Sequence, residues 1–225
     1  MKIKAAVLSA MGAPRPYGLS RPLEIHEVDL QGPGPGEVLV KIAAAGLCHS
    51  DLSVIDGNRP RPLPRLLGHE ASGVVAEVGP GVSDLKPGDQ VIFLFVASCG
   101  DCPQCRRARP VLCDTAVVHN TAGDLAGGVR RLSRQGHPLF HHSGVSAFAE
   151  YATVSRRSLV RVEKDLPLDI AAVLGCAVIT GAGAVFNTAY LHPGDRAAVI
   201  GLSGWVWPPS WPRMHQARRR SWWLT

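Results

Sequence analysis

The apolar positions of this chain fall in short runs that glycine and proline interrupt, a pattern typical of β-strands joined by turns. Gly/Pro-rich turns are predicted at residues 31–36 and 86–89. Between and around these turns, the apolar runs predict strands at residues 3–9, 22–28, 37–45, 72–78, 90–96, 148–153 and 157–162. So many short strands favour a mainly β, barrel-like domain.

Helical patterns are fewer, and they are predicted at about 50–55, 169–174 and 180–189. A turn at 192–195 then leads into an apolar, strand-like run that ends at Gly201. Residues 114–145 show neither a helical nor a strand-like pattern of apolar residues and contain several glycines, so they are predicted to form a loop. The histidines of this segment are expected to be solvated rather than to bind metal: His137, His141 and His142.

Composition narrows the class of protein. The chain has 225 residues, of which 46% are hydrophobic, and this supports a folded core. It contains no run of eighteen apolar residues, so no membrane span is expected. Residues 1–4 lead straight into a strand-like run without a signal-peptide pattern, which predicts a cytoplasmic protein.

The net charge of +6 comes mostly from the last 21 residues, which carry four arginines and no acid. Without them, 20 basic residues face the 18 acidic ones, a balance of +2. A nearly neutral body argues against nucleic acid as the partner. All five tryptophans also lie in these last 21 residues, so the composition changes sharply at about residue 205.

Four cysteines follow one another with the spacing C-x2-C-x2-C-x7-C: Cys99, Cys102, Cys105 and Cys113. Four thiolates at this density can surround one ion tetrahedrally, as structural zinc requires. In a cytosolic chain, close cysteine pairs favour metal over a disulfide. A redox pair or an iron–sulfur centre is the alternative, but nothing else in the chain indicates electron transfer.

Cys48 and His69 offer a second set of metal-binding side chains. A catalytic zinc takes three protein ligands and leaves a fourth position open. Cys176 is the cysteine that remains once the others are assigned, so it is the candidate third ligand. The alternative is that Cys48 is a buried thiol and His69 an ordinary core histidine.

Together, these motifs resemble those of the zinc-dependent medium-chain alcohol dehydrogenases over residues 1 to about 204. The resemblance rests on Gly68-His69-Glu70, the four-cysteine segment, Gly175-Cys176 with Thr180-Gly-Ala-Gly, and Pro193-Gly194-Asp195. It implies a GroES-like catalytic domain at 1–165 with a structural zinc lobe at 95–115. Residues 166–204 would then hold linker helices and the first strand of a Rossmann coenzyme domain.

The resemblance also implies an activity and its cofactors. It implies NAD-linked oxidation of a small alcohol to an aldehyde or ketone, and the reverse reaction. Two zinc ions per chain are expected, one catalytic and one structural, in a family whose full-length members are homo-oligomers.

The same resemblance implies roles for individual residues. Cys48, His69 and Cys176 resemble the catalytic zinc ligands, and the structural zinc falls to Cys99, Cys102, Cys105 and Cys113. Glu70 resembles an acid beside the metal, and Asp51 the carboxylate that orients the ligand histidine. Ser50 resembles the hydroxyl that accepts the substrate's proton, and otherwise it would be a helix cap.

The remaining roles concern the coenzyme and the substrate. His49 resembles a basic residue at the coenzyme pyrophosphate, and Thr180 one against the nicotinamide. Phe95 and Phe148 resemble aromatic walls of the alcohol pocket, and otherwise they would be ordinary core residues. In many relatives, a histidine five positions after the first cysteine ligand passes the proton on from the hydroxyl that Ser50 resembles. This chain has Ser53 at that position, so this part of the proton transfer is expected to differ.

The chain departs from the dinucleotide-binding fingerprint G-x-G-x-x-G. Gly201 and Gly204 are present, but Ser203 replaces the second glycine and Val206 the third. Prolines 208, 209 and 212 oppose the helix that should follow, and no second strand or ribose-binding acid is expected. The NAD site is therefore expected to be incomplete, with little or no turnover by the 225-residue chain.

Residues 205–225 are interpreted as an aberrant, non-family tail on a truncated chain. Restoring one base in the coding DNA before the codon of Trp205 would, with suitable codons, recover the glycine at position 206 and a second strand. A frameshift is therefore the favoured hypothesis. A genuine short product, a non-catalytic zinc-binding fragment with a basic Trp-rich interaction tail, is the alternative. Among enzymes, a formaldehyde or polyol dehydrogenase is the runner-up, and Cys176 favours the alcohol or formaldehyde branch.

Overall fold

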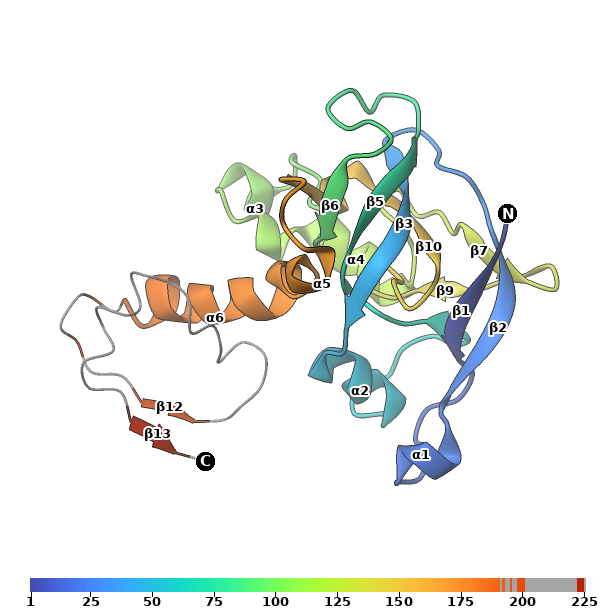
Figure 1. Cartoon of the computed structure of the whole chain (residues 1–225), viewed down its shortest axis with the longest axis horizontal. Coiled ribbons are helices and arrows are strands. Elements are labelled where there is room, and N and C mark those ends of the chain that lie inside the picture. Colours follow the sequence, from blue (N-terminus) through green and yellow to red (C-terminus); the bar gives the residue numbers. More distant parts are fainter. Residues whose placement is uncertain (191, 193–194, 196–197, 201–221, 225) are drawn as a thin grey trace.

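The computed structural model describes residues 1–190, 192, 195, 198–200 and 222–224. Figure 1 shows a β-rich body from which a helical arm extends. The first sheet has six strands in the spatial order β8 (His137–Pro138), β7 (Leu132–Arg134), β2 (Leu23–Leu30), β1 (Lys2–Leu8), β4 (Arg65–Leu66) and β9 (Phe140–His141). The second has five, in the order β10 (Tyr151–Ser155), β3 (Glu37–Gly46), β5 (Glu70–Val78), β6 (Gln90–Phe93) and β11 (Leu159–Val162).

Residues 148–150 join the two sheets. The N–H of Ala6 in the first sheet donates to the carbonyl oxygen of Phe148 at 2.8 Å, and the N–H of Ile42 in the second donates to that of Glu150 at 3.0 Å. Irregularities in the pairing of β3 with β5 add curvature to the second sheet. The result is the mainly β, barrel-like domain that the sequence predicts.

Apolar side chains of both sheets form the core. One cluster includes Val38, Val40 and Phe93 from the second sheet, and another includes Ile3, Val7 and Leu66 from the first. Burying these side chains removes apolar surface from water, which is the main favourable contribution to folding.

The seven predicted strands all have counterparts, with ends that differ by a few residues. The predicted helix at 50–55 is α2 (His49–Ile55). The short helices of the body that the sequence does not predict are α1 (Tyr17–Ser20), α3 (Pro103–Arg106), η1 (Pro110–Leu112) and η2 (Arg156–Ser158).

The loop predicted at residues 114–145 is wrong. This segment contains helix α4 (Asp114–Ala122) and the strands β7, β8 and β9. His141 and His142 are buried rather than solvated, whereas His137 is exposed. The strands of this segment are only two or three residues long, so they leave no readable period in the sequence.

The helical arm runs through Leu168–Thr188 and comprises α5 (Leu168–Ala171), the π-helical turn η3 (Leu174–Val178), α6 (Ile179–Gly183) and the π-helical turn η4 (Ala184–Thr188). It is long and apolar enough to cross a membrane by length and composition, with a mean hydropathy of 2.0. That alone is weak evidence for a membrane, because helices of a protein core pass the same test. One face packs on the body through Ala171, Ala172 and Cys176, while Ile170 and Ile179 are exposed.

Beyond the arm, the strand expected near 197–200 is present as β12 (Ala198–Ile200). It pairs in parallel with β13 (Trp222–Leu224), although the sequence analysis expects no second strand. The two tryptophans of this strand favour extended backbone, but three residues are too short for a strand pattern to show in the sequence. Gly201, Gly204 and the rest of 201–221 lie outside the described residues.

Arg65 of β4 is fully buried without a charged partner among the described residues. Its Nε donates to the carbonyl oxygen of Pro62 at 3.1 Å, but Nη1 and Nη2 have no hydrogen-bond partner in that part of the chain. Burial, together with the nearby Arg61, lowers the pKa of Arg65 to about 10. A buried, unpaired guanidinium is costly, so this position destabilises the fold.

We therefore expect Arg65→Met to raise the free energy of unfolding by about 2 kcal/mol, because the thioether fills the space without a charge to desolvate. Urea unfolding of both chains measures the change. The control is Arg161→Met in β11, where the arginine is exposed and the effect should be small. A loss of stability in Arg65→Met would show that the guanidinium has a stabilising partner.

Candidate functional site

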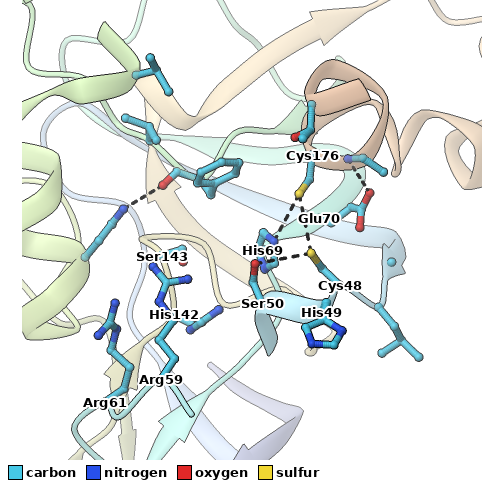
Figure 2. A pocket seen from close by; sticks show the side chains of 18 of the residues that line it. Cys48, His49, Ser50, Arg59, Arg61, His69, Glu70, His142, Ser143 and Cys176 are labelled. Atoms are coloured by element: carbon cyan, nitrogen blue, oxygen red, sulfur yellow. Dashed lines mark hydrogen bonds between the residues drawn. The ribbon is translucent and has the colours of Figure 1, made fainter. Parts of the chain in front are cut away.

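Three side chains from distant parts of the sequence meet at one point. Cys48 precedes α2, His69 lies between β4 and β5, and Cys176 belongs to the π-helical turn η3. The Sγ atoms of Cys48 and Cys176 are 3.9 Å apart, and Nε2 of His69 is 3.5 Å from Sγ of Cys176 (Figure 2). Their ligand atoms all lie within 4.8 Å of one another, close enough to hold one metal ion.

The ionisation of this cluster favours metal binding. The hydrogen bond with Cys176 and the contact with His69 lower the pKa of Cys48 to about 3. The same sulfur pair raises the pKa of Cys176. One thiolate and one thiol therefore face the ring of His69, whose pKa burial lowers but the contacts with Asp51 and Cys48 raise to about 9. Thiolate and neutral imidazole are the donors that zinc prefers, so metal binding here would release protons.

A buried carboxylate fixes the orientation of His69. Oδ2 of Asp51 lies 3.1 Å from Nδ1 of His69, while Oδ1 accepts the N–H of Gly68 at 2.9 Å. Burial would raise the pKa of Asp51, but His69 and His142 lower it below its ordinary value. Asp51 therefore remains a carboxylate, and its position leaves Nε2 of His69 free to face the two cysteines.

The turn before His69 requires a glycine. Gly68 has φ +90°, in the left-handed region, and a Cβ there would come within 2.6 Å of the backbone nitrogen of Phe148. Because the N–H of Gly68 also binds Asp51, this residue connects the turn to the carboxylate.

His142 is a residue that sequence reasoning missed. Its Nε2 lies 3.4 Å from Oδ1 of Asp51, and its ring centre is 5.6 Å from that of His69. Burial lowers the pKa of His142 to about 3, so the ring is neutral. The only signal was its place in the His141-His142 pair, which was interpreted as loop. His141 is a core residue whose Nε2 accepts the N–H of Arg131 at 3.1 Å.

Two further residues contact the cluster as expected from their positions. Glu70 is buried, and its Oε1 accepts the N–H of Ala177 at 3.2 Å, one residue beyond Cys176. Oγ of Ser50 lies 3.7 Å from Sγ of Cys48. Ser50 is inside α2, whose N-cap is Cys48, so the alternative of a capping serine is not supported.

Cys99, Cys102, Cys105 and Cys113 form a separate cluster, and their ligand atoms also lie within 4.8 Å of one another. Backbone N–H groups point at the sulfurs: that of Cys99 lies 3.2 Å from Sγ of Cys113, and that of Cys102 lies 3.3 Å from Sγ of Cys99. Hydrogen bonds, first from Thr115 and then from backbone, lower the pKa of Cys99 to about 6. Such a closed set of four sulfurs fits a structural metal and leaves no open position.

A cavity of about 760 Å³ opens over the three-ligand cluster. Cys48, His69 and Cys176 line it together with the predicted residues His49, Ser50, Glu70, Phe95 and Thr180. The ring of Phe95 meets His69 edge-on, with 5.7 Å between the ring centres. Arg59, Arg61, His142 and Ser143 also line the cavity, and sequence reasoning assigned them no role.

Phe148 does not join these residues. It is not among the described residues that line the cavity. Its side chain packs instead against the apolar core beside Gly68. These contacts favour the core alternative, and a place for Phe148 in the pocket wall stays a prediction.

Comparison with known proteins agrees with this geometry. Residues 34–164, more than half of the chain, match the family model described as the alcohol dehydrogenase GroES-like domain. The chain belongs to this family. The family match includes Cys48, His69 and the four-cysteine cluster.

Among curated proteins, the chain is 43% identical over 203 residues to an S-(hydroxymethyl)glutathione dehydrogenase of Escherichia coli, a match that covers 90% of this chain and 53% of that relative. The chain thus spans about half the length of the curated relatives it matches. An alcohol dehydrogenase zinc-binding domain protein of Burkholderia ambifaria superimposes with a TM-score of 0.80 at 37% identity, covering 89% of this chain and 52% of that one. A benzyl alcohol dehydrogenase of Acinetobacter calcoaceticus superimposes with a TM-score of 0.78 at 35% identity, and the match covers 89% of this chain and 52% of that one.

Proposed function

We propose that this chain carries the metal centre and alcohol pocket of a zinc-dependent, NAD-linked alcohol dehydrogenase. The observation that carries the proposal is the meeting of Cys48, His69 and Cys176 at the floor of one cavity, with Asp51 behind the histidine. In domain terms, residues 1–165 would be the catalytic domain with its zinc lobe at 95–115. Residues 166–204 would begin the coenzyme domain.

Two zinc ions fit the described side chains. Cys48, His69 and Cys176 would hold one, and Cys99, Cys102, Cys105 and Cys113 the other. At the three-ligand cluster, zinc would supply Lewis-acid chemistry, which lowers the pKa of an alcohol hydroxyl. NAD would supply the hydride acceptor.

The side chains around the cluster then have distinct tasks. Ser50, next to Cys48, is placed to accept the hydroxyl proton, and Asp51 holds the tautomer of His69. Phe95 closes one wall and keeps water away from the reacting carbon. His49 and Thr180 line the same cavity, and this supports their assignment to the coenzyme side.

A small alcohol or aldehyde is the proposed substrate, since the relatives named above are dehydrogenases of benzyl alcohol and of S-(hydroxymethyl)glutathione. The second of these names supports a formaldehyde-type dehydrogenase as the second candidate. Cys176 at the third ligand position fits both candidates.

Metal analysis tests the proposal. Purified chain should contain two zinc ions, and Cys176→Ser should reduce the content toward one because a ligand of the three-ligand cluster weakens. The control is Ser53→Ala, which changes an exposed hydroxyl in the same region and should leave two ions. One zinc ion in the unmodified chain would contradict the proposed catalytic centre.

A further inference from the structure

The two ends of the cavity differ in charge. One end holds the metal-binding cluster and Glu70, and the other holds Arg59 and Arg61 from the segment between α2 and β4. Figure 2 shows both arginine side chains on the side away from Cys176 and Glu70, with His142 and Ser143 near them. A molecule that reaches the metal cluster can therefore extend toward two guanidinium groups.

These guanidinium groups are not neutralised by acids. Within the part of the chain that the structure describes, neither Arg59 nor Arg61 forms an ion pair with a carboxylate. Nη1 of Arg61 donates only to the carbonyl oxygen of Pro60, at 3.0 Å. Figure 2 shows both side chains on the same side of the cavity, and burial, and then the positive charge of Arg59, lower the pKa of Arg61.

Burial, and then Arg61, lower the pKa of the nearby Arg65, which does not line the cavity, while Asp124 acts in the opposite direction. Two guanidinium groups at one end of a cavity, with no ion-paired carboxylate among the described residues, favour an anion there.

The walls between the two ends are mostly apolar. They are formed by side chains of Phe95, Val96, Val111, Val117 and Val173. Such side chains fit a hydrocarbon or aromatic body.

We propose that Arg59 and Arg61 form a carboxylate-binding subsite, so that the substrate is an alcohol with an apolar body and a carboxylate at its far end. This inference rests on the proposed function, because it takes the metal cluster as the place of the hydroxyl. Planar guanidinium groups bind carboxylates through paired, charge-assisted hydrogen bonds, which give both affinity and orientation.

The experiment compares two alcohols of the same shape on the zinc-loaded chain, benzyl alcohol and 4-(hydroxymethyl)benzoate. NMR titration at low salt should show the carboxylate-bearing alcohol binding about tenfold more tightly or better. The preference should shrink as salt is added, because ions screen exposed charges. It should disappear in the double variant Arg59→Met/Arg61→Met, in which benzyl alcohol binds as before.

Arg161→Met is the matched control, since it removes an exposed arginine that does not line the cavity, and it should keep the preference. Equal affinity for the two alcohols would overturn the subsite and leave the proposed function standing. Binding of neither alcohol would overturn both. If the double variant keeps the preference but loses affinity for NAD, the arginines serve the coenzyme and the inference is wrong.

Discussion

Replacing Cys113 with serine should remove one zinc ion per chain and unfold the segment around it. Cys113 is fully buried, and its Sγ accepts the N–H of Cys99 at 3.2 Å and that of Ala116 at 3.4 Å. The sulfur therefore caps α4 as well as belonging to the four-cysteine cluster. Structural zinc in small sites is bound with about 10 kcal/mol or more, so most of the order of this segment depends on the metal.

The measurements are zinc content and amide hydrogen exchange. Zinc should fall from two ions to one, and exchange should accelerate in α3, η1 and α4 but not in β3 and β5. Val118→Ser is the control. Val118 is an exposed residue of α4 that contributes no sulfur to the cluster, so its replacement should leave both results unchanged. Protection of α4 in Cys113→Ser equal to that of the unmodified chain would show that the metal does not hold the lobe.

Replacing Asp51 with asparagine should weaken zinc at the three-ligand cluster by about 10- to 100-fold. The carboxylate faces His69 at 3.1 Å and His142 at 3.4 Å, and it accepts the N–H of Gly68. An amide retains the shape but loses the negative charge, so Nδ1 of His69 is held less firmly and Nε2 becomes a poorer ligand. The four-cysteine cluster shares no residue with this network and should keep its zinc.

A chelator titration that resolves two zinc ions measures this effect. Asp56→Asn is the control, because this aspartate follows α2 and its side chain bonds only to Asn58 among the described residues. Its two zinc affinities should match those of the unmodified chain. Unchanged affinity at both sites in Asp51→Asn would show that Asp51 does not support the ligand histidine.

The parts of the site that could be predicted are those with a local sequence signature. The four cysteines lie within a short segment, and the spacing alone indicates one ion. Cys48, His69 and Cys176 are far apart in sequence, so their meeting was expected mainly from the family resemblance. The strands were also predictable, because alternation and unbroken apolar runs are local properties of the chain.

What could not be predicted depends on long-range packing. His142 becomes buried because its segment folds beside Asp51 of α2, a contact across about ninety positions that no local pattern records. Phe95 and Phe148 are both aromatic residues near strand ends, yet one reaches the cavity and the other the core. Arg59 and Arg61 belong to no motif in the sequence, and the cavity shows that they face a common space.

The two metal clusters also differ in how much of the chain must be in place before they exist. Cys99 and Cys113 are 14 positions apart, whereas Cys48 and Cys176 are 128 apart. The entropy of loop closure grows with the logarithm of length, so this difference alone makes the second cluster about 2 kcal/mol more costly to close. The four-cysteine cluster therefore needs only one short, contiguous segment to come together. The three-ligand cluster has no such unit, since it arises only when both sheets and the helical arm have assembled.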